Sequence, residues 1–291
     1  MTDQIKRRRY TKRRQQLQQR MVLFGGLLLI SACIGVSCYA RGKEIKDREI
    51  STIEDREDIE VTRQKTINEK AETFEERVAR VKEEVQGKGY PAEVIELLNK
   101  NSETVDFVEN YEANKDAPYP DTIGESYQEG EIPLLFQWDE RWGYAPYGTS
   151  LVAVCGCGPT CMAMVASGLT NDPYITPDKV AAFGTQNNYV DENNNTYWSF
   201  MREAGANWNI SCYEGILTEE QAAAELAQGR PIICSVGPGD FTDNGHFIVL
   251  TDYENGNVTV NDPFSRANSE KTWVYADIAG QFLAMWVYYL P

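Results

Sequence analysis

The chain has 291 residues, of which 42% are hydrophobic, and a formal net charge of −16 at pH 7. This length allows one or two domains, and the apolar content is sufficient for a buried core. Such an acidic chain disfavours binding to nucleic acid or to an anionic membrane face, and it favours solubility or basic ligands.

The N-terminus combines a basic segment with an apolar one. Residues 1–20 carry eight basic side chains, and the run from Met21 to Ala40 contains no charged residue. An apolar stretch of about 20 residues is long enough to cross a bilayer as a helix. By the positive-inside rule, residues 1–20 form a cytoplasmic tail, residues 21–40 a single-pass anchor in the cell membrane, and the chain after Arg41 lies outside the cell. A nucleic-acid-binding arm is the weaker interpretation of the basic segment.

A second interpretation of the apolar run remains open. Leu29-Ile30-Ser31-Ala32-Cys33 is similar to a bacterial lipoprotein cleavage box, in which lipidation of Cys33 removes the preceding residues. Apolar residues continue past Cys33 to Ala40, as a spanning helix requires and a short signal segment does not. We therefore prefer the uncleaved transmembrane anchor.

Residues 41–89 are rich in charge and carry one apolar stripe. Its members are spaced by four and three residues in turn, which places them on one face of a helix that Gly87 and Gly89 end. We predict a charged helical stalk here, either a short coiled coil that permits self-association or a lone helix packed on the domain. The stripe consists of Ile67, Ala71, Phe74, Val78, Val81 and Val85.

Residues 90–130 connect this stalk to the rest of the chain. Two short amphipathic helices are predicted, over residues 92–98 and 102–111, where they brace the main domain. Residues 112–130 contain Pro118, Pro120 and Gly124 and are predicted to be a linker.

All six tryptophans lie in residues 131–291, which are therefore the packed domain. A helix with Pro177 in its first turn is predicted to end at Gly184, and a second helix opens at Thr218 and ends at Gly229. The fold class is α+β, with helices early and an antiparallel sheet late. Strands are predicted at residues 231–236, 246–253 and 258–261, with further aromatic-rich strands to residue 289.

Cys157 is the candidate nucleophile. Pro159 favours the first helical turn, so Cys157 falls at or just before a helix N-terminus. The unpaired N–H groups there stabilise a thiolate, and a nearby imidazolium stabilises it further. We expect Cys161, four residues along the same helix, to point into the core. Cys155 lies before the turn, where the helix terminus helps it less.

The seven cysteines suggest neither a disulfide framework nor a metal site. Their number is odd, and with a single histidine a zinc cluster of cysteine and histidine is not expected. Cys155 and Cys157 are too close for a redox pair of the Cys-x-x-Cys kind. No motif for phosphate, metal or redox cofactor is present, so we expect no cofactor.

His246 is the only histidine and so the only candidate for an imidazole base. It opens a predicted strand, and Asp262 lies on the next one. A two-residue turn at Asn255-Gly256 would place these two side chains on opposite faces of the sheet. A three-residue loop, Glu254-Asn255-Gly256 with Gly256 as a bulge, pairs His246 with Phe264 and makes Asp262 a same-face diagonal neighbour. We therefore predict the bulged loop, with Asp262 as a simple turn residue as the alternative.

Residues 131–291 resemble a known family through five short runs taken together. They are similar to papain-like cysteine peptidases related to the bacteriocin-processing, double-glycine type, in particular to stand-alone domains on bacterial cell surfaces. The runs are Ile132-Pro133-Leu134-Leu135-Phe136-Gln137-Trp138-Asp139, Gly156-Cys157-Gly158-Pro159-Thr160, Gly239-Asp240-Phe241-Thr242, Gly245-His246-Phe247-Ile248-Val249-Leu250 and Asn261-Asp262-Pro263.

The resemblance implies a papain-like fold and a role for each matched residue. Cys157 is the implied nucleophile, His246 the base and then the acid, and Asp262 the orienter. Gln137 matches the glutamine whose side-chain amide forms the oxyanion hole together with the Cys157 backbone N–H.

The substrate groove is expected to differ from that of the family. Asn195-Thr196-Tyr197-Trp198 stands where a run similar to Gly-Thr-Ser-Trp is expected. Gly158 and Trp198 are the candidates for lining the groove, although a core position is the more frequent one for a tryptophan.

Three functions remain open. The preferred one is a membrane-anchored cysteine peptidase or amide hydrolase that acts outside the cell on a peptide or protein through a thioester acyl-enzyme. A catalytically silent peptide-binding module on a stalk also fits the acidic charge and the aromatic content. A thiol acyltransferase differs only in that an amine resolves the thioester.

Overall fold

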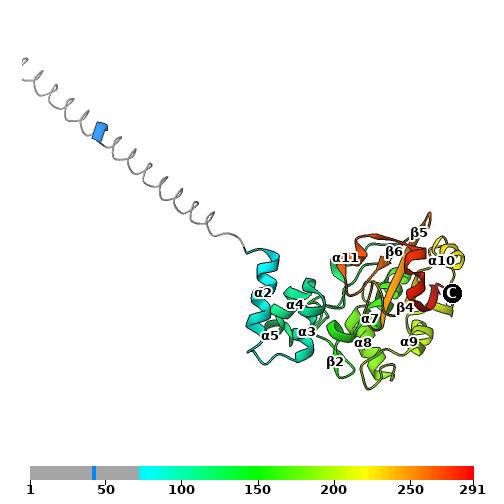
Figure 1. The fold of residues 1–291 in the computed structure, drawn as a ribbon, viewed down its shortest axis with the longest axis horizontal. Coiled ribbons are helices and arrows are strands. Elements are labelled where there is room, and N and C mark those ends of the chain that lie inside the picture. Colours follow the sequence, from blue (N-terminus) through cyan, green and yellow to red (C-terminus); the bar gives the residue numbers. More distant parts are fainter. Residues whose placement is uncertain (1–40, 44–71) are drawn as a thin grey trace, which may run out of the picture. The chain divides into compact units, whose positions relative to one another are not determined.

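The structure is a computed structural model that describes residues 41–43 and 72–291 (Figure 1). Residues 73–291 form one compact unit. Among the described residues, no helix is long and apolar enough to span a membrane. The predicted tail, the apolar run with Cys33 and stalk residues 44–71 lie outside the described residues.

Short helices gather at one end of the compact unit (Figure 1). A capping box of Thr73 and Glu76 starts α2 (Phe74–Val85), and the apolar side of α2 is buried against α3 (Ala92–Lys100) and α4 (Val105–Glu109). This described part of the predicted stalk is therefore a helix packed on the domain, the second alternative. We call residues 74–114 the N-terminal brace.

The brace differs from the prediction in its second half. The helix predicted over residues 102–111 is broken, because Thr104 and Asn110 have ψ angles of 7° and 4°. The segment forms η1 (Ser102–Thr104), α4 and α5 (Tyr111–Asn114), and the single turn η2 (Gly124–Ser126) follows in the predicted linker.

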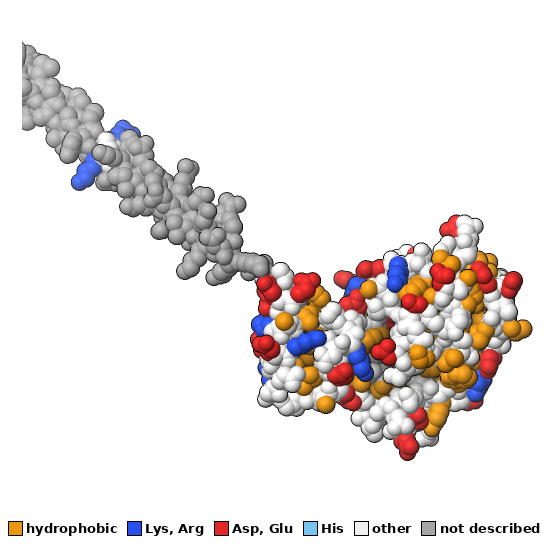
Figure 2. Space-filling model, viewed as in Figure 1, with side chains coloured by type: hydrophobic (Ala, Val, Ile, Leu, Met, Phe, Trp, Pro, Cys, Tyr) orange, Lys and Arg blue, Asp and Glu red, His pale blue; other side chains and the backbone are white. Residues whose placement is uncertain are grey.

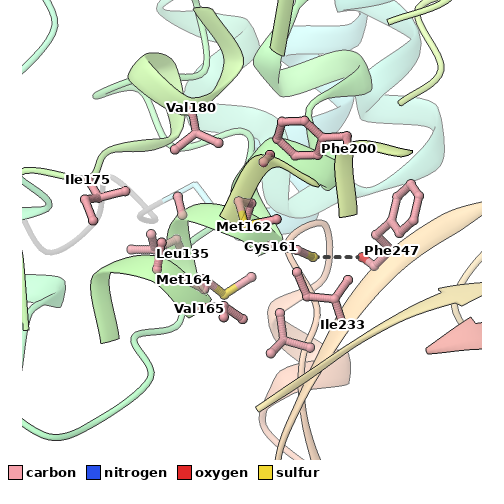
Figure 3. Packing of buried hydrophobic residues seen from close by; sticks show 14 of the residues in the cluster. Leu135, Cys161, Met162, Met164, Val165, Ile175, Val180, Phe200, Ile233 and Phe247 are labelled. Carbon is pink, nitrogen blue, oxygen red and sulfur yellow. Dashed lines mark hydrogen bonds between the residues drawn. The ribbon is translucent and has the colours of Figure 1, made fainter. Parts of the chain in front are cut away.

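Helix α7 (Cys157–Thr170) runs through the middle of the unit and is buried over residues 158–168. It packs against α8 (Pro177–Gln186), and Figure 3 shows its methionines and Cys161 beside side chains from α8 and the sheet. Helix α8 continues past the predicted end at Gly184 to Gln186, and Gly184 lies inside the helix where a Cβ would be 3.2 Å from the ring of Tyr147. Nearby lie β1 (Pro146–Tyr147), β2 (Ser150–Leu151), α6 (Val152–Cys155), α9 (Trp198–Glu203) and η3 (Ala204–Trp208).

A six-stranded antiparallel sheet has the strand order β3-β8-β4-β5-β6-β7. Successive residues of a strand face opposite sides of the sheet. Ile233 belongs to the core shared with α7, whereas Ile232 belongs to the core shared with α10 (Glu219–Leu226) and α12 (Tyr275–Ile278). The α+β prediction is confirmed. The remaining elements are β3 (Ser211–Glu214), β4 (Ile232–Val236), β5 (His246–Glu254), β6 (Asn257–Asn261), α11 (Arg266–Ser269), β7 (Thr272–Val274), η4 (Ala279–Gln281) and β8 (Phe282–Tyr289).

The turn between β5 and β6 has two residues. Asn255 and Gly256 both have positive φ, at 50° and 86°, and Glu254 pairs with Asn257. Positive φ at both central residues is the geometry of a type I′ hairpin, which Asn-Gly favours. The predicted three-residue bulged loop is therefore wrong.

The extra residue lies in the strand instead. Thr251 of β5 has no partner in β6, because the register shifts between Leu250 and Asp252. Beyond this β-bulge Val249 lies opposite Asn261, which is the register that the bulged loop would have produced. His246 and Asp262 are therefore on the same face, as predicted.

Candidate active site

Cys157 is the first residue of α7, where the sequence places it. The chain turns sharply from α6 into α7 at Gly156, and a Cβ there would lie 2.5 Å from the carbonyl oxygen of Val152. Only glycine permits this turn. Since the first N–H groups of a helix have no intrahelical acceptor, the backbone N–H of Cys157 remains available at the helix end.

Two neighbouring cysteines lie in different surroundings. The Cys161 thiol is fully buried and donates to the carbonyl oxygen of Phe247 at 3.3 Å (Figure 3). The Cys155 thiol donates to the carbonyl oxygen of Leu151 at 3.3 Å, and burial raises the pKa of Cys155 to about 12. Burial also raises the pKa of Cys161. Both thiols therefore stay protonated at neutral pH, and the core position expected for Cys161 is confirmed.

His246 and Asp262 are in direct contact. The imidazole Nε2 lies 2.8 Å from Asp262 Oδ1, and both side chains are buried. Cys157 lines the same cleft as His246, and its side chain helps to raise the pKa of the imidazole. Because Nε2 is occupied by Asp262, Nδ1 is the ring nitrogen left free for a further partner. The structure thus brings Cys157, His246 and Asp262 together at one cleft.

The pair of His246 and Asp262 is charged at neutral pH. Burial alone lowers the pKa of His246, but the hydrogen bonds and charges of Asp262 and Cys157 outweigh it and raise the pKa to about 10. Burial alone raises the pKa of Asp262, but the hydrogen bonds from His246 and Asn268 and the imidazole charge lower it overall. An imidazolium held against a carboxylate results.

The loop after β6 holds the Asp262 carboxylate in place. Oδ1 accepts the backbone N–H of Phe264 at 2.8 Å, and Oδ2 accepts Nδ2 of Asn268 at 2.8 Å. Asn268 is not predicted from the sequence, because an asparagine six residues after the aspartate matches no local motif. These bonds fix the carboxylate plane that faces the imidazole.

Gln137 lines the same cleft and is almost fully buried. Its Nε2 donates to the carbonyl oxygen of Ala153 at 2.9 Å, and its backbone N–H donates to the carbonyl oxygen of Pro263 at 2.8 Å. A primary amide carries a second N–H on the same nitrogen. Gln137 therefore lines the cleft together with Cys157, and one of its side-chain N–H donors is bound to Ala153.

The cleft has a volume of about 470 Å³ and one apolar wall. Trp198 is 41% exposed and meets Trp286 edge-on, with ring centroids 5.7 Å apart. Leu283 of β8 is 53% exposed and lines the same cleft. Of the two positions considered for Trp198, the structure has the groove one and not the core one: one side of the indole meets Trp286, and the ring lines the cleft.

Gly158 lies behind the cleft surface. It is buried, and a Cβ at this position would lie 2.6 Å from Thr196 Oγ1. The glycine lets Thr196, which lines the cleft, approach the start of α7. Gly158 therefore shapes the groove through packing, and the prediction that it lines the groove is corrected.

A second hollow of about 370 Å³ continues from the cleft past His246. Both hollows are lined by Lys100 and Phe264, but only the first is lined by Cys157. Lys100 ends α3, so the N-terminal brace supplies part of the wall. No pattern in the sequence predicts this contribution of Lys100. Within residues 41–43 and 72–291, no group of three or more His, Cys, Asp or Glu side chains is placed to hold a metal ion.

Comparison with known proteins identifies the class of this domain. Residues 129–290 match the Peptidase_C39 like family, and this match covers more than half of the chain. The chain therefore belongs to that family, and the segment is a papain-like peptidase domain of the bacteriocin-processing type. The resemblance stated from the sequence is confirmed, and family membership supports a cysteine peptidase function.

Two solved structures are similar to the chain. One is the peptidase domain of ComA from Streptococcus, a bifunctional ABC transporter involved in a quorum-sensing pathway, with 15% identity over 47% of this chain and 92% of that chain and a TM-score of 0.37. The other is a protein from Bacillus anthracis assigned as a C39-like peptidase, with 14% identity over 54% of this chain and 94% of that chain and a TM-score of 0.33. No curated protein matches the chain.

Proposed function

We propose that this protein is a membrane-anchored cysteine peptidase that hydrolyses peptide bonds outside the cell. The observation that carries the proposal is that Cys157, at the start of α7, and His246, which is bound to Asp262, line one cleft. Nucleophile, base and orienter within hydrogen-bond reach of one another are the parts of a covalent hydrolase.

In the first half of the reaction the peptide bond is cleaved. The Cys157 sulfur attacks the carbonyl carbon, and the carbonyl electrons move onto the oxygen. As the tetrahedral species collapses, the C–N bond breaks and the His246 imidazolium gives its proton to the leaving amine. A thioester on Cys157 and a neutral imidazole remain.

In the second half the thioester is hydrolysed. The neutral His246 takes a proton from water, whose oxygen attacks the thioester carbon, and the C–S bond breaks. The acid product leaves, and the imidazolium beside Cys157 is restored. Asp262 keeps its charge throughout and holds the ring by Nε2, so that Nδ1 faces the sulfur.

Gln137 and the Cys157 backbone N–H are the proposed oxyanion donors. We expect Gln137→Ala to lower kcat by about 10²-fold to 10³-fold, because the developing charge loses one donor. Alkylation of Cys157 by iodoacetamide builds no oxyanion, so its rate should stay close to that of the wild type. Equal losses in both reactions would assign Gln137 to folding only, through its bond to Ala153.

The apolar wall predicts a preference for substrates with a bulky apolar side chain near the cleaved bond. Trp198→Ala should lower kcat/KM for such a peptide by about tenfold or more, since burying one large apolar side chain is worth about 1.5–3 kcal/mol. Tyr197→Ala is the matched control, because Tyr197 is 48% exposed and does not line the cleft. Equal effects of the two variants on peptides with and without the apolar residue would refute the preference.

The membrane location rests on the sequence. The basic residues 1–20 and the uncharged run 21–40 support an anchor with the peptidase outside. The compact unit is predominantly acidic, and Figure 2 shows acidic side chains scattered over the face in view. Reporter enzymes that are active on only one side of the membrane, fused after residue 43 and after residue 291, test this topology, and a cytoplasmic signal from both would refute it.

The test of the peptidase function is a peptide library read by mass spectrometry. The full chain and its Cys157→Ala variant are each incubated with the same library, and new termini are counted. Termini that form only with the wild type support the proposal. No difference between the two proteins would leave a binding module as the function, and products capped by an added amine would identify an acyltransferase.

A further inference from the structure

The turn that follows α3 reaches across to the loop that carries Asp262. From its contacts we propose that Asn101 and Glu103 of the N-terminal brace are positioning residues for the Asp262 carboxylate. The inference rests on the proposed function, because it assigns these residues a role in that reaction. Both residues lie outside the segment that matches the family, residues 129–290.

Asn101 holds one carbonyl group of the loop after β6, the loop that carries Asp262. Its Nδ2 donates to the carbonyl oxygen of Phe264 at 2.6 Å, across 163 positions of sequence. Nε1 of Trp138 donates to the same oxygen at 2.8 Å. Two side-chain donors therefore fix this oxygen on the side of the loop that faces away from Asp262.

The fixed carbonyl belongs to the peptide unit whose N–H, that of Ser265, bonds to Asp262. In a planar trans peptide the C=O and the N–H point in opposite directions. With the Phe264 oxygen held by Asn101, the N–H of Ser265 turns toward Asp262, where it lies 3.3 Å from Oδ1. Oδ1 is also the atom that binds His246 at 2.8 Å. Asn101 is thus one peptide unit away from the contact that orients the imidazole.

Glu103 fixes the next two residues of the loop. Its Oε2 accepts the backbone N–H of Arg266 at 2.8 Å, and its Oε1 accepts that of Ala267 at 3.0 Å. These residues directly precede Asn268, whose side chain binds the other oxygen of Asp262. Glu103 therefore holds the loop on the Oδ2 side as Asn101 holds it on the Oδ1 side.

The two residues also fix each other. Oδ1 of Asn101 accepts the backbone N–H of Glu103 at 2.9 Å, and Nδ2 of Asn101 donates to Glu103 Oε2 at 3.2 Å. The turn that bears them lies between α3 and α4, whose apolar side chains Leu97, Leu98 and Val105 are buried in the brace core. A rigid support of this kind keeps a site residue within the narrow geometry that catalysis needs.

A double-mutant cycle tests whether the two residues act through Asp262. Asn101→Ala, the near-isosteric Asn101→Asp and Glu103→Gln are each made alone and together with Asp262→Asn, in the full chain. The rate of Cys157 alkylation by iodoacetamide at pH 6 and the kcat of peptide cleavage are measured. We expect each variant to slow both reactions about two- to tenfold in the wild-type background, as for loss of one hydrogen bond. In the Asp262→Asn background the same substitutions should change little.

Matched controls lie on the same brace. Asn99→Ala removes an exposed asparagine whose side chain bonds to Glu96, and Glu112→Gln removes an exposed glutamate paired with Lys115. Neither control should slow alkylation or cleavage. Equal losses from Asn101→Asp in both backgrounds would overturn the inference, because the residue would then serve the fold without passing through Asp262.

The outcomes separate this inference from the proposed function. If the rates of selective Cys157 alkylation and of peptide turnover are unchanged in all three brace variants, the positioning role is overturned and the peptidase proposal stays intact. A wild-type chain without selective alkylation or turnover would overturn both. Unfolding followed by tryptophan fluorescence reports the same unit, because all six tryptophans lie in residues 131–291. It thereby identifies any variant that fails to fold.

Discussion

Replacement of Cys157 by alanine is expected to lower peptide turnover by about four to six orders of magnitude, because without the sulfur no acyl-enzyme forms. The structure gives Cys157 three features of a nucleophile. It starts α7, it lines the cleft together with His246, and its side chain helps to raise the pKa of that imidazole. Hydrolysis measured with a peptide selected from the library gives the ratio directly.

Cys155→Ala is the matched control for this prediction. Cys155 also lines the cleft, but its thiol donates to backbone carbonyls and burial raises its pKa to about 12. At neutral pH it is therefore a protonated thiol, and its replacement should change turnover no more than a few fold. A large loss in Cys155→Ala together with an active Cys157→Ala would transfer the nucleophile role to Cys155.

Replacement of Asp262 by asparagine is expected to lower kcat by about 10²-fold to 10⁴-fold. The substitution keeps the size of the side chain but removes the charge that helps to raise the pKa of His246. Less imidazolium then stands beside Cys157, and the ring loses the acceptor that orients it. Activity measured from pH 5 to pH 10 should show that the alkaline limb moves to lower pH in the variant. An unchanged limb would contradict the charge pairing.

The same pair predicts how the stability difference between the wild type and Asp262→Asn depends on pH. The pKa of His246 is raised in the folded state. Its contribution to the free energy of unfolding is therefore full below the ordinary histidine pKa of 6.5 and is lost as the pH rises toward about 10. The pKa of Asp262 is lowered in the folded state. Its contribution to the free energy of unfolding is therefore present above the ordinary aspartate pKa of 3.8 and is lost as the pH falls below that value. Urea unfolding should therefore show the largest difference at about pH 5 to 6 and a small one near pH 10. A difference that grows with pH would contradict the assignment.

The β5–β6 hairpin shows which features of this fold the sequence predicts and which it does not. Requiring His246 and Asp262 on one face demanded one extra residue in the β5–β6 hairpin, and the structure contains one. The local signal for its position was misread, because Asn255-Gly256 is a strong two-residue turn and the bulge at Thr251 has no sequence mark. The register was therefore predictable from function, whereas the place of the bulge was not.

The residues of the site also differ in whether local sequence features predict them. Cys157 was placed by Pro159 and the apolar run of α7, which are local features. Asn101 and Glu103 bond to residues 163 or more positions away, and no spacing rule connects such distant polar side chains. The sequence leaves both a groove and a core position open for Trp198, because exposure depends on what the rest of the fold leaves uncovered, and the residues of one short helix do not contain that information.

The most direct test of the proposed active site is the alkylation of the full chain by iodoacetamide across pH, with the modified residue located by peptide mass. We expect rapid modification confined to Cys157 at pH 6 to 7, where an ordinary thiol with a pKa near 8.5 is mostly protonated. His246→Ala should remove this advantage. Slow labelling spread over several cysteines, or selective labelling of Cys157 that persists unchanged in His246→Ala, would contradict the thiolate–imidazolium pair on which the proposed peptidase depends.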